Sequence, residues 1–319
     1  MPLKKIVNEV SSAIYSLPWY VARDEGFFAD EGLDLEFVPT SQEGTPKNGS
    51  EDTRLVNPIV CHAPFEDGQV KLFRACEEGN VRRAYDLSKK TVEGHEARIT
   101  SLQPSRPLHA IVVAPNSPID RPAQLAGVPV GVNFFAGSHF AAIRLLEGFI
   151  GRERVKLQHF GGPASRFDAV LAGEVPAAVI MEPYVSLAEK LGANILAQGH
   201  FVATDVARDD LPQEDLKALY RALDRASDFL NATPANKRKY ISYLIGDIPE
   251  GYRWGRPDAA DFHLPRLRFG HTLPYPKNEF DRSLEILEQY DLLSPGVSSF
   301  GNLVDNSAIS AAAHWSAIT

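Results

Sequence analysis

The sequence has few of the features that mark several large protein classes. Its 319 residues include two cysteines, Cys61 and Cys76, which is too few for a disulfide framework. No apolar run approaches the roughly 20 residues that span a bilayer. The net charge of −8 argues against a nucleic-acid-binding surface. The remaining composition, 44% hydrophobic and 23% charged, is that of a globular protein long enough for two lobes.

Motifs for metals and common cofactors are also missing. The nine histidines are scattered singly, and neither a His-x-x-x-His nor a Cys-x-x-Cys spacing occurs. No Gly-x-Gly-x-x-Gly or phosphate-binding P-loop follows a predicted strand. We therefore expect no protein-bound metal and no cofactor.

The first residues contain no apolar leader and no small-residue cleavage site. Met1 to Lys5 lead directly into the first predicted strand. We expect the protein to work in the cytoplasm. The alternative is the periplasm, if a signal peptide has been removed from this sequence.

The stretch from Val10 to Val38 organises the chain. Apolar residues before Val10 predict a short buried strand, and Pro18 suits the first turn of a helix that stops near Gly26. Alternating apolar and mostly acidic residues at 33–38 predict a second strand. In such a strand–loop–helix–strand unit the first loop lies beyond the carboxyl end of a strand, where open α/β sheets bind ligands.

The run from Leu17 to Phe37 resembles the opening of a known superfamily. It holds aliphatic-sulfonate and nitrate solute-binding proteins, thiamine-pyrimidine synthase-like proteins and enzymes such as an aromatic sulfinate desulfinase. The resemblance implies an α/β, two-lobed periplasmic-binding-protein type II fold, each lobe a mixed sheet flanked by helices. We expect the chain to cross between the lobes twice, with residues 1–115 and 200–319 forming lobe one and residues 116–199 lobe two. A small organic anion should bind in the interlobe cleft.

A strand–loop–helix unit in lobe two is the best candidate for binding that anion. Val128–Val132 predict a strand, and Ser138 can cap a helix from His139 to about Ile150. The unpaired N–H groups and positive dipole end of that helix would face the cleft. We therefore expect Asn133, Gly137 and Ser138 to contact the ligand; plain capping without a ligand is the alternative.

Further ligand contacts are expected on both sides of the cleft. Gly162 lies in a turn that can approach a ligand closely. The run Met181-Glu-Pro-Tyr resembles the family's cleft wall, where Glu182 would receive the next helix or face the ligand and Tyr184 would offer a stacking face. An aromatic and basic segment at 252–256 could line the cleft or cover a surface. From lobe one the candidates are Ser12, Tyr15, Trp19 and Gln42.

Three residues are candidates for catalysis. His62 has a suitable unperturbed pKa for acid–base work, Arg74 could clamp a carboxylate, and Cys61 could be a nucleophile. The desulfinase-like enzymes have a comparable His-then-Arg arrangement, but their nucleophilic cysteine lies in the first loop, where this chain has Ser11 and Ser12. The alternatives are a core cysteine, a buried structural histidine and a solvated arginine.

Two functions remain open from the sequence. The first, which we expect, is a cytoplasmic enzyme of lyase type, such as a decarboxylase or desulfinase, that uses the cleft. The alternative is the solute-binding component of an ABC importer for sulfonate, nitrate or pyrimidine-type solutes, with a permease as its partner and no catalysis. The missing leader favours the enzyme, whereas the missing first-loop cysteine favours the importer component.

Overall fold

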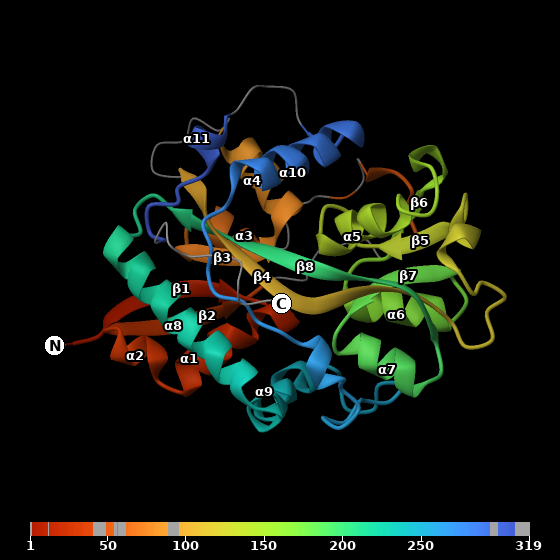
Figure 1. The fold of residues 1–319 in the computed structure, drawn as a ribbon, viewed down its shortest axis with the longest axis horizontal. Coiled ribbons are helices and arrows are strands. Elements are labelled where there is room, and N and C mark those ends of the chain that lie inside the picture. The colour runs from red at the N-terminus through yellow and green to blue at the C-terminus, as the bar shows by residue number, and fades with distance from the viewer. Residues whose placement is uncertain are drawn as a thin grey trace.

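The computed structural model describes residues 2–11, 13–40, 49–53, 56, 62–88, 96–293 and 299–309. Its strands form one eight-stranded sheet in the order β2-β1-β3-β8-β4-β7-β5-β6, with helices above and below it (Figure 1). The α/β class predicted from the sequence is confirmed. Of the helices described, none is long and apolar enough to cross a membrane.

The first half of the sheet contains the predicted strand–helix–strand unit. β1 (Lys4–Val10) pairs in parallel with β2 (Leu33–Pro39) on one side and with β3 (Leu72–Cys76) on the other. Between β1 and β2 lies α1 (Leu17–Asp24), with Pro18 in its first turn as expected. The sequence pattern therefore predicted this unit nearly to the residue.

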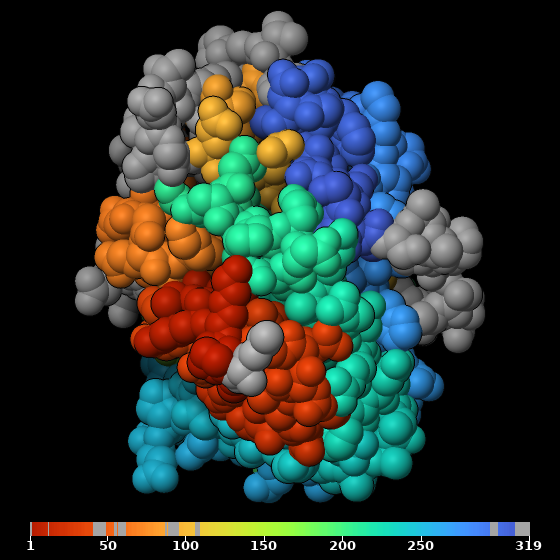
Figure 2. Space-filling model, turned by 90° about the vertical axis from the view of Figure 1, so that its left-hand side faces the viewer, coloured from red at the N-terminus to blue at the C-terminus, as the bar shows by residue number. Residues whose placement is uncertain are grey.

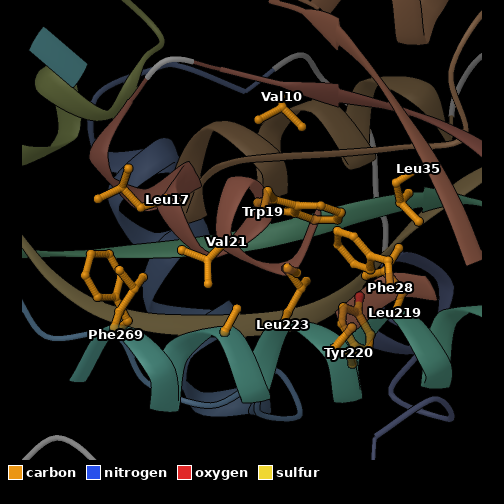
Figure 3. Packing of buried hydrophobic residues seen from close by; sticks show 14 of the residues in the cluster. Val10, Leu17, Trp19, Val21, Phe28, Leu35, Leu219, Tyr220, Leu223 and Phe269 are labelled. Atoms are coloured by element: carbon orange, nitrogen blue, oxygen red, sulfur yellow. The ribbon is translucent and has the colours of Figure 1, made fainter. Parts of the chain in front are cut away.

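A long amphipathic helix covers the unit. The helix α8 (Gln213–Ala232) presents Leu219 and Leu223 to α1, and Figure 3 shows these side chains in one apolar cluster with Trp19. Figure 2 shows the red N-terminal segment and the teal α8 side by side on one face. The neighbouring elements are η1 (Ile14–Ser16), α2 (Phe27–Asp30), α9 (Pro234–Gly246), α3 (Ala63–Glu66), α4 (Glu77–Leu87), η6 (Leu264–Arg266), α10 (Lys277–Gln289) and α11 (Phe300–Leu303).

Two long antiparallel strands join the halves of the sheet. β4 (Ala97–Val113) and β8 (Asn194–Arg208) pair along most of their length and cross the middle of Figure 1. One end of β8 pairs with β3, whereas the far end of β4 pairs with β7 (Ala177–Met181). The chain thus passes between the halves inside these strands, and the boundaries at 115 and 199 remain predictions.

The second half repeats the strand–loop–helix pattern. β5 (Pro129–Val132) pairs in parallel with β6 (Lys156–His159) and with β7. A helix follows each of these three strands, so three helix N-termini lie near the same edge of the sheet. They are α5 (Gly137–Leu146), α6 (Pro163–Leu171) and α7 (Tyr184–Lys190), with the short η4 (Pro122–Leu125) and η5 (Arg152–Arg154) as connections.

A third connection between the halves was not predicted. After α9, Ile248 is buried in the apolar core of the second half. The carboxylate of Asp168 on α6 accepts hydrogen bonds from Tyr252 Oη at 2.6 Å and Trp254 Nε1 at 2.9 Å. The expectation of two crossings is therefore incomplete. The segment around Trp254 covers a surface of the second half rather than lining the cavity described below.

Candidate functional site

A cavity of about 510 Å³ lies between the two halves. It is lined by residues of η1 and α4 from the first half, by the loop before α5, and by the starts of α6 and α7. This is the position expected for a ligand in an open α/β sheet. The predicted site residues that line it are Tyr15, His62, Asn133, Gly137, Ser138, Gly162, Glu182 and Tyr184.

The start of α5 exposes backbone donors to this cavity. The helix begins at Gly137, two residues earlier than predicted, and its N-cap is Ala136. Ser138 is therefore not the cap; its Oγ accepts a hydrogen bond of 2.9 Å from the N–H of Asn133. Among the described residues, no acceptor pairs with the N–H of Gly137 or Ser138. Both groups are therefore available to an anion at the positive end of the helix.

Two buried histidines hold the loop that precedes α5. The N–H of Phe134 donates to His159 Nδ1 and that of Phe135 to His139 Nδ1, each at 3.1 Å. An accepting imidazole nitrogen must be unprotonated, and burial, together with the charge of Arg82, lowers the pKa of His139 to about 3. Phe135 has a φ of 63°, a left-handed conformation that is rare for a bulky residue. Sequence reasoning missed both histidines because each is a single residue without a motif.

Packing around the start of α5 requires glycine at position 137. A Cβ at this position would lie 2.8 Å from Cε2 of Phe201, 3.2 Å from Cε1 of His109 and 3.3 Å from Cβ of Cys76. The backbone of α5 can therefore approach β8 and β4 this closely only with glycine here.

Arg166 brings a buried positive charge to the cavity. It lies one turn into α6, is 3% exposed, and donates from Nε to the carbonyl of Val179 at 2.6 Å and from Nη1 to that of Gly161. In the described part of the chain, no carboxylate forms an ion pair with it. Burial lowers the pKa of Arg166 to about 9, so the side chain is still a cation at neutral pH.

Sequence reasoning also missed Arg166. The signal was its spacing, because the N–H of Arg166 bonds to the carbonyl of Gly162, one helical turn away. Gly162 was predicted to approach a ligand closely, and Arg166 lies one helical turn further along the helix that begins there. Together with burial, the charge of Arg166 lowers the pKa of His109, another cavity residue, to about 3.

The other arginines at the cavity already have carboxylate partners. Arg83 lies with Nε 3.8 Å from Glu66 Oε1, and Arg82 with Nη2 3.7 Å from Asp86 Oδ2. Arg82 also donates to the carbonyl of Leu292 at 2.8 Å. Each of these two arginines thus has a carboxylate within 4 Å, in contrast to Arg166.

Glu182 receives the helix that follows it, which is the first of the two roles predicted for it, and it also lines the cavity. Its carboxylate accepts hydrogen bonds at 3.0 Å from both the N–H and the Oγ of Ser186, in the first turn of α7. Burial raises the pKa of Glu182 to about 7. Tyr184 lines the cavity beside it, and its ring contacts Phe167 and Tyr252 at centroid distances of 5.4 and 6.3 Å.

His62 lines the first-half side of the cavity as part of a buried pair. Its Nδ1 is hydrogen-bonded to Oε1 of Glu9, and its ring packs on Phe73 with centroids 4.3 Å apart. Burial raises the pKa of Glu9 to about 8, and burial beside Arg83 holds the pKa of His62 well below its usual value. We therefore assign the pair as neutral at pH 7, with one proton shared between carboxyl and imidazole.

Arg74 and Trp19 do not line the cavity. Arg74 donates from Nε and Nη2 to both oxygens of Asp205, at 2.7 and 3.0 Å, and this ion pair is buried. Its predicted role as a carboxylate clamp does not fit this placement, because a carboxylate of the protein already occupies the fork. Trp19, 1% exposed, belongs to the apolar core under α8 (Figure 3). Ser12, Gln42 and Cys61 lie outside the described residues.

Cys76 also lines the cavity, on the first-half side. Burial raises the pKa of its thiol to about 12, so it is not a thiolate at neutral pH and is a poor nucleophile. Within the described residues there is no group of three His, Cys, Asp or Glu side chains that could hold a metal ion.

Comparison with known sequences gives two short matches. A family model described as NMT1/THI5 like matches residues 13–51. The tRNA-specific 2-thiouridylase MnmA of Methylorubrum extorquens (strain PA1) is 36% identical over 93 residues, 26% of this chain and 23% of that protein. The chain thus spans about a quarter of the length of this curated relative, too little to show a shared family.

Solved structures match over nearly the whole chain. The alkanesulfonate-binding protein SsuA from Xanthomonas axonopodis pv. citri, bound to MOPS, has a TM-score of 0.71 at 15% identity over 96% of this chain and 100% of its own. The periplasmic nitrate-binding protein NrtA from Synechocystis PCC 6803 has 0.60 at 14%, over 94% and 84%. The desulfurization enzyme DSZB has 0.58 at 14%, over 96% and 97%. The chain therefore has the periplasmic-binding-protein fold, and its predicted resemblance in fold to sulfonate-binding, nitrate-binding and desulfinase-like proteins is confirmed.

Proposed function

We propose that this chain binds a small organic anion in the cavity and releases it unchanged, as the solute-binding component of an ABC importer. Sulfonates are the first solutes to test. The likeness to alkanesulfonate- and nitrate-binding proteins supports this proposal over the enzyme that we expected from the sequence. The partner would then be an importer permease and the compartment the periplasm.

Arg166 is the observation that carries the proposal. A buried guanidinium without a carboxylate partner is costly, because two carbonyl dipoles compensate a full charge only in part. A sulfonate or carboxylate could accept from its remaining N–H groups. The N–H groups of Gly137 and Ser138 line the same cavity and would donate to the same guest. The site would thus bind an anion without any metal.

Isothermal titration calorimetry with sodium benzenesulfonate, methanesulfonate and benzoate tests the proposal. We expect one-to-one binding of at least one anion, and Arg166→Gln should weaken it by about 30-fold, equivalent to about 2 kcal/mol for a charged hydrogen bond. Arg152→Gln is the matched control, because Arg152 is an exposed arginine that does not line the cavity. Equal affinity of Arg166→Gln and the parent protein would refute the assignment.

A second candidate function rests on the Glu9–His62 pair. Glu9 fixes one nitrogen of His62, so Nε2 is the atom that could exchange a proton with a guest in the cavity. Chromatography of each anion after prolonged incubation with the protein separates the two functions. Recovery of unchanged anion supports the importer component. Turnover that is lost in His62→Gln would support the enzyme instead.

A further inference from the structure

An aromatic pair forms part of the cavity lining. The rings of Tyr15, from η1, and Phe201, from β8, stack with centroids 4.7 Å apart and planes inclined by 17°. Both residues line the cavity. Phe201 is 2% exposed and also contacts the edge of His109 at a centroid distance of 5.1 Å. Phe201 is therefore fixed between β8 and β4, and Tyr15 stacks against it from the first half.

This aromatic pair lies directly beside the proposed anion-binding donors. Cε2 of Phe201 is the nearest atom to the place where a Cβ of Gly137 would be, at 2.8 Å. An anion that accepts a hydrogen bond from the N–H of Gly137 therefore has aromatic carbon next to it. Tyr15, which stacks on Phe201, lines the same cavity as these donors.

The size of the cavity also points to an organic body on the anion. Its volume of about 510 Å³ is within the range of sites for organic ligands of roughly 300–1,000 Å³. Nitrate or methanesulfonate would fill only a small part of it. Water would then remain against Tyr15, Phe201, Phe134 and Phe135, all of which line the cavity, and that arrangement loses the free energy of apolar contact.

From these observations we infer that the preferred guest is an aryl anion, an aromatic ring that carries a sulfonate or carboxylate. This inference rests on the proposed function. Arg166 and the start of α5 hold the charged group, and the Tyr15–Phe201 pair holds the ring by offset stacking. Tyr15 is then a specificity-determining residue, because its ring distinguishes aromatic from saturated guests.

A matched pair of ligands tests the inference. Benzenesulfonate and cyclohexanesulfonate have the same anionic group and the same ring size, but only the first has an aromatic ring. We expect the parent protein to bind benzenesulfonate about tenfold more tightly, the selectivity that one good aromatic contact gives. Tyr15→Leu should reduce this ratio to about twofold, whereas Tyr15→Phe, which retains the ring, should keep it.

Each outcome separates the ring contact from the anion site. Equal binding of the two ligands by the parent protein would overturn the inference and leave the proposed function standing. An unchanged ratio in Tyr15→Leu, with the fold verified by circular dichroism, would also overturn it. If neither of these ligands bound, and methanesulfonate and benzoate did not bind either, the proposed function itself would fail. If Arg166→Gln weakened both ligands equally and Tyr15→Leu weakened only benzenesulfonate, both would be supported.

Discussion

The two halves of the molecule differ in how they use buried polar groups. In the first half these groups pair with one another inside the protein: Arg74 with Asp205, and His62 with Glu9 as a neutral pair. On the second-half side, the guanidinium of Arg166 has carbonyl partners only and lies at the cavity. The comparison teaches that burial does not identify a binding arginine. The absence of a carboxylate partner, among the residues that the structure describes, is what makes Arg166 the proposed anion-binding residue.

The largest effect is expected when the carboxylate partner of Arg74 is removed, which tests whether the first-half arginine has a structural role. Asp205→Ala should lower the free energy of unfolding by about 3–5 kcal/mol, because it leaves a buried guanidinium uncompensated. The Oγ of Ser101, which donates to Asp205 at 2.7 Å, loses its acceptor as well. Urea denaturation followed by circular dichroism measures the loss. Anion affinity of the folded protein should change less than twofold, since Arg74 does not line the cavity.

A double variant is the control for this experiment. Arg74→Met with Asp205→Leu removes both charges and should recover part of the lost stability. A loss below about 1 kcal/mol in Asp205→Ala would contradict the structural role of the pair. Weakened anion binding in the folded Asp205→Ala protein would restore Arg74 as a candidate ligand residue.

The next largest effect is expected on the second-half side, at the start of α5. Gly137→Ala places a methyl group 2.8 Å from Phe201, so either the helix or the ring must move. We expect a loss of about 1–3 kcal/mol in the free energy of unfolding from overpacking, together with weaker anion binding. Gly148→Ala is the matched control, because no atom lies within 4 Å of its added methyl group. Its unfolding free energy should stay within about 0.5 kcal/mol of the parent, and equal effects of the two substitutions would contradict the close packing.

The same comparison explains what the sequence could predict. Asn133, Gly137, Glu182 and Tyr184 follow strands within single strand–loop–helix units, so local pattern was enough to place them at the cavity. Arg166 belongs to such a unit too, but it lies inside the helix, where an arginine usually faces solvent.

The first-half residues could not be placed in this way. Arg74 meets Asp205 only because β3 pairs with β8, a contact between distant parts of the chain. Trp19 is in the core because α8, almost two hundred residues later, covers α1. Local periodicity contains neither relation, so the pattern that predicted α1 could not show that Trp19 would be buried under α8 or that Arg74 would pair with Asp205.

The smallest expected effect is on the pH dependence of stability, and it concerns the neutral Glu9–His62 pair of the first half. Burial raises the pKa of Glu9 from 4.5 to about 8, and those of Glu77 and Glu182 to about 7. Above the unfolded value of 4.5, the folded protein keeps protons that the unfolded chain has lost. The contribution of these carboxyl groups to the free energy of unfolding is complete below pH 4.5. It is lost as the pH rises through their pKa values in the folded protein. The free energy of unfolding should therefore fall between pH 6.5 and 8.

The buried histidines oppose this trend only at lower pH. The pKa values of His62, His109 and His139 are lowered, so unfolding takes up protons below the usual histidine value of 6.5, and their stabilising effect is complete above it. Glu9→Gln removes one titrating carboxyl but keeps a neutral group beside His62. It should reduce the fall between pH 6.5 and 8 by about 1 kcal/mol, measured by urea denaturation at several pH values. A slope unchanged by Glu9→Gln would mean that Glu9 is already ionised at neutral pH, and the first-half side would then contain a true Glu9–His62 ion pair.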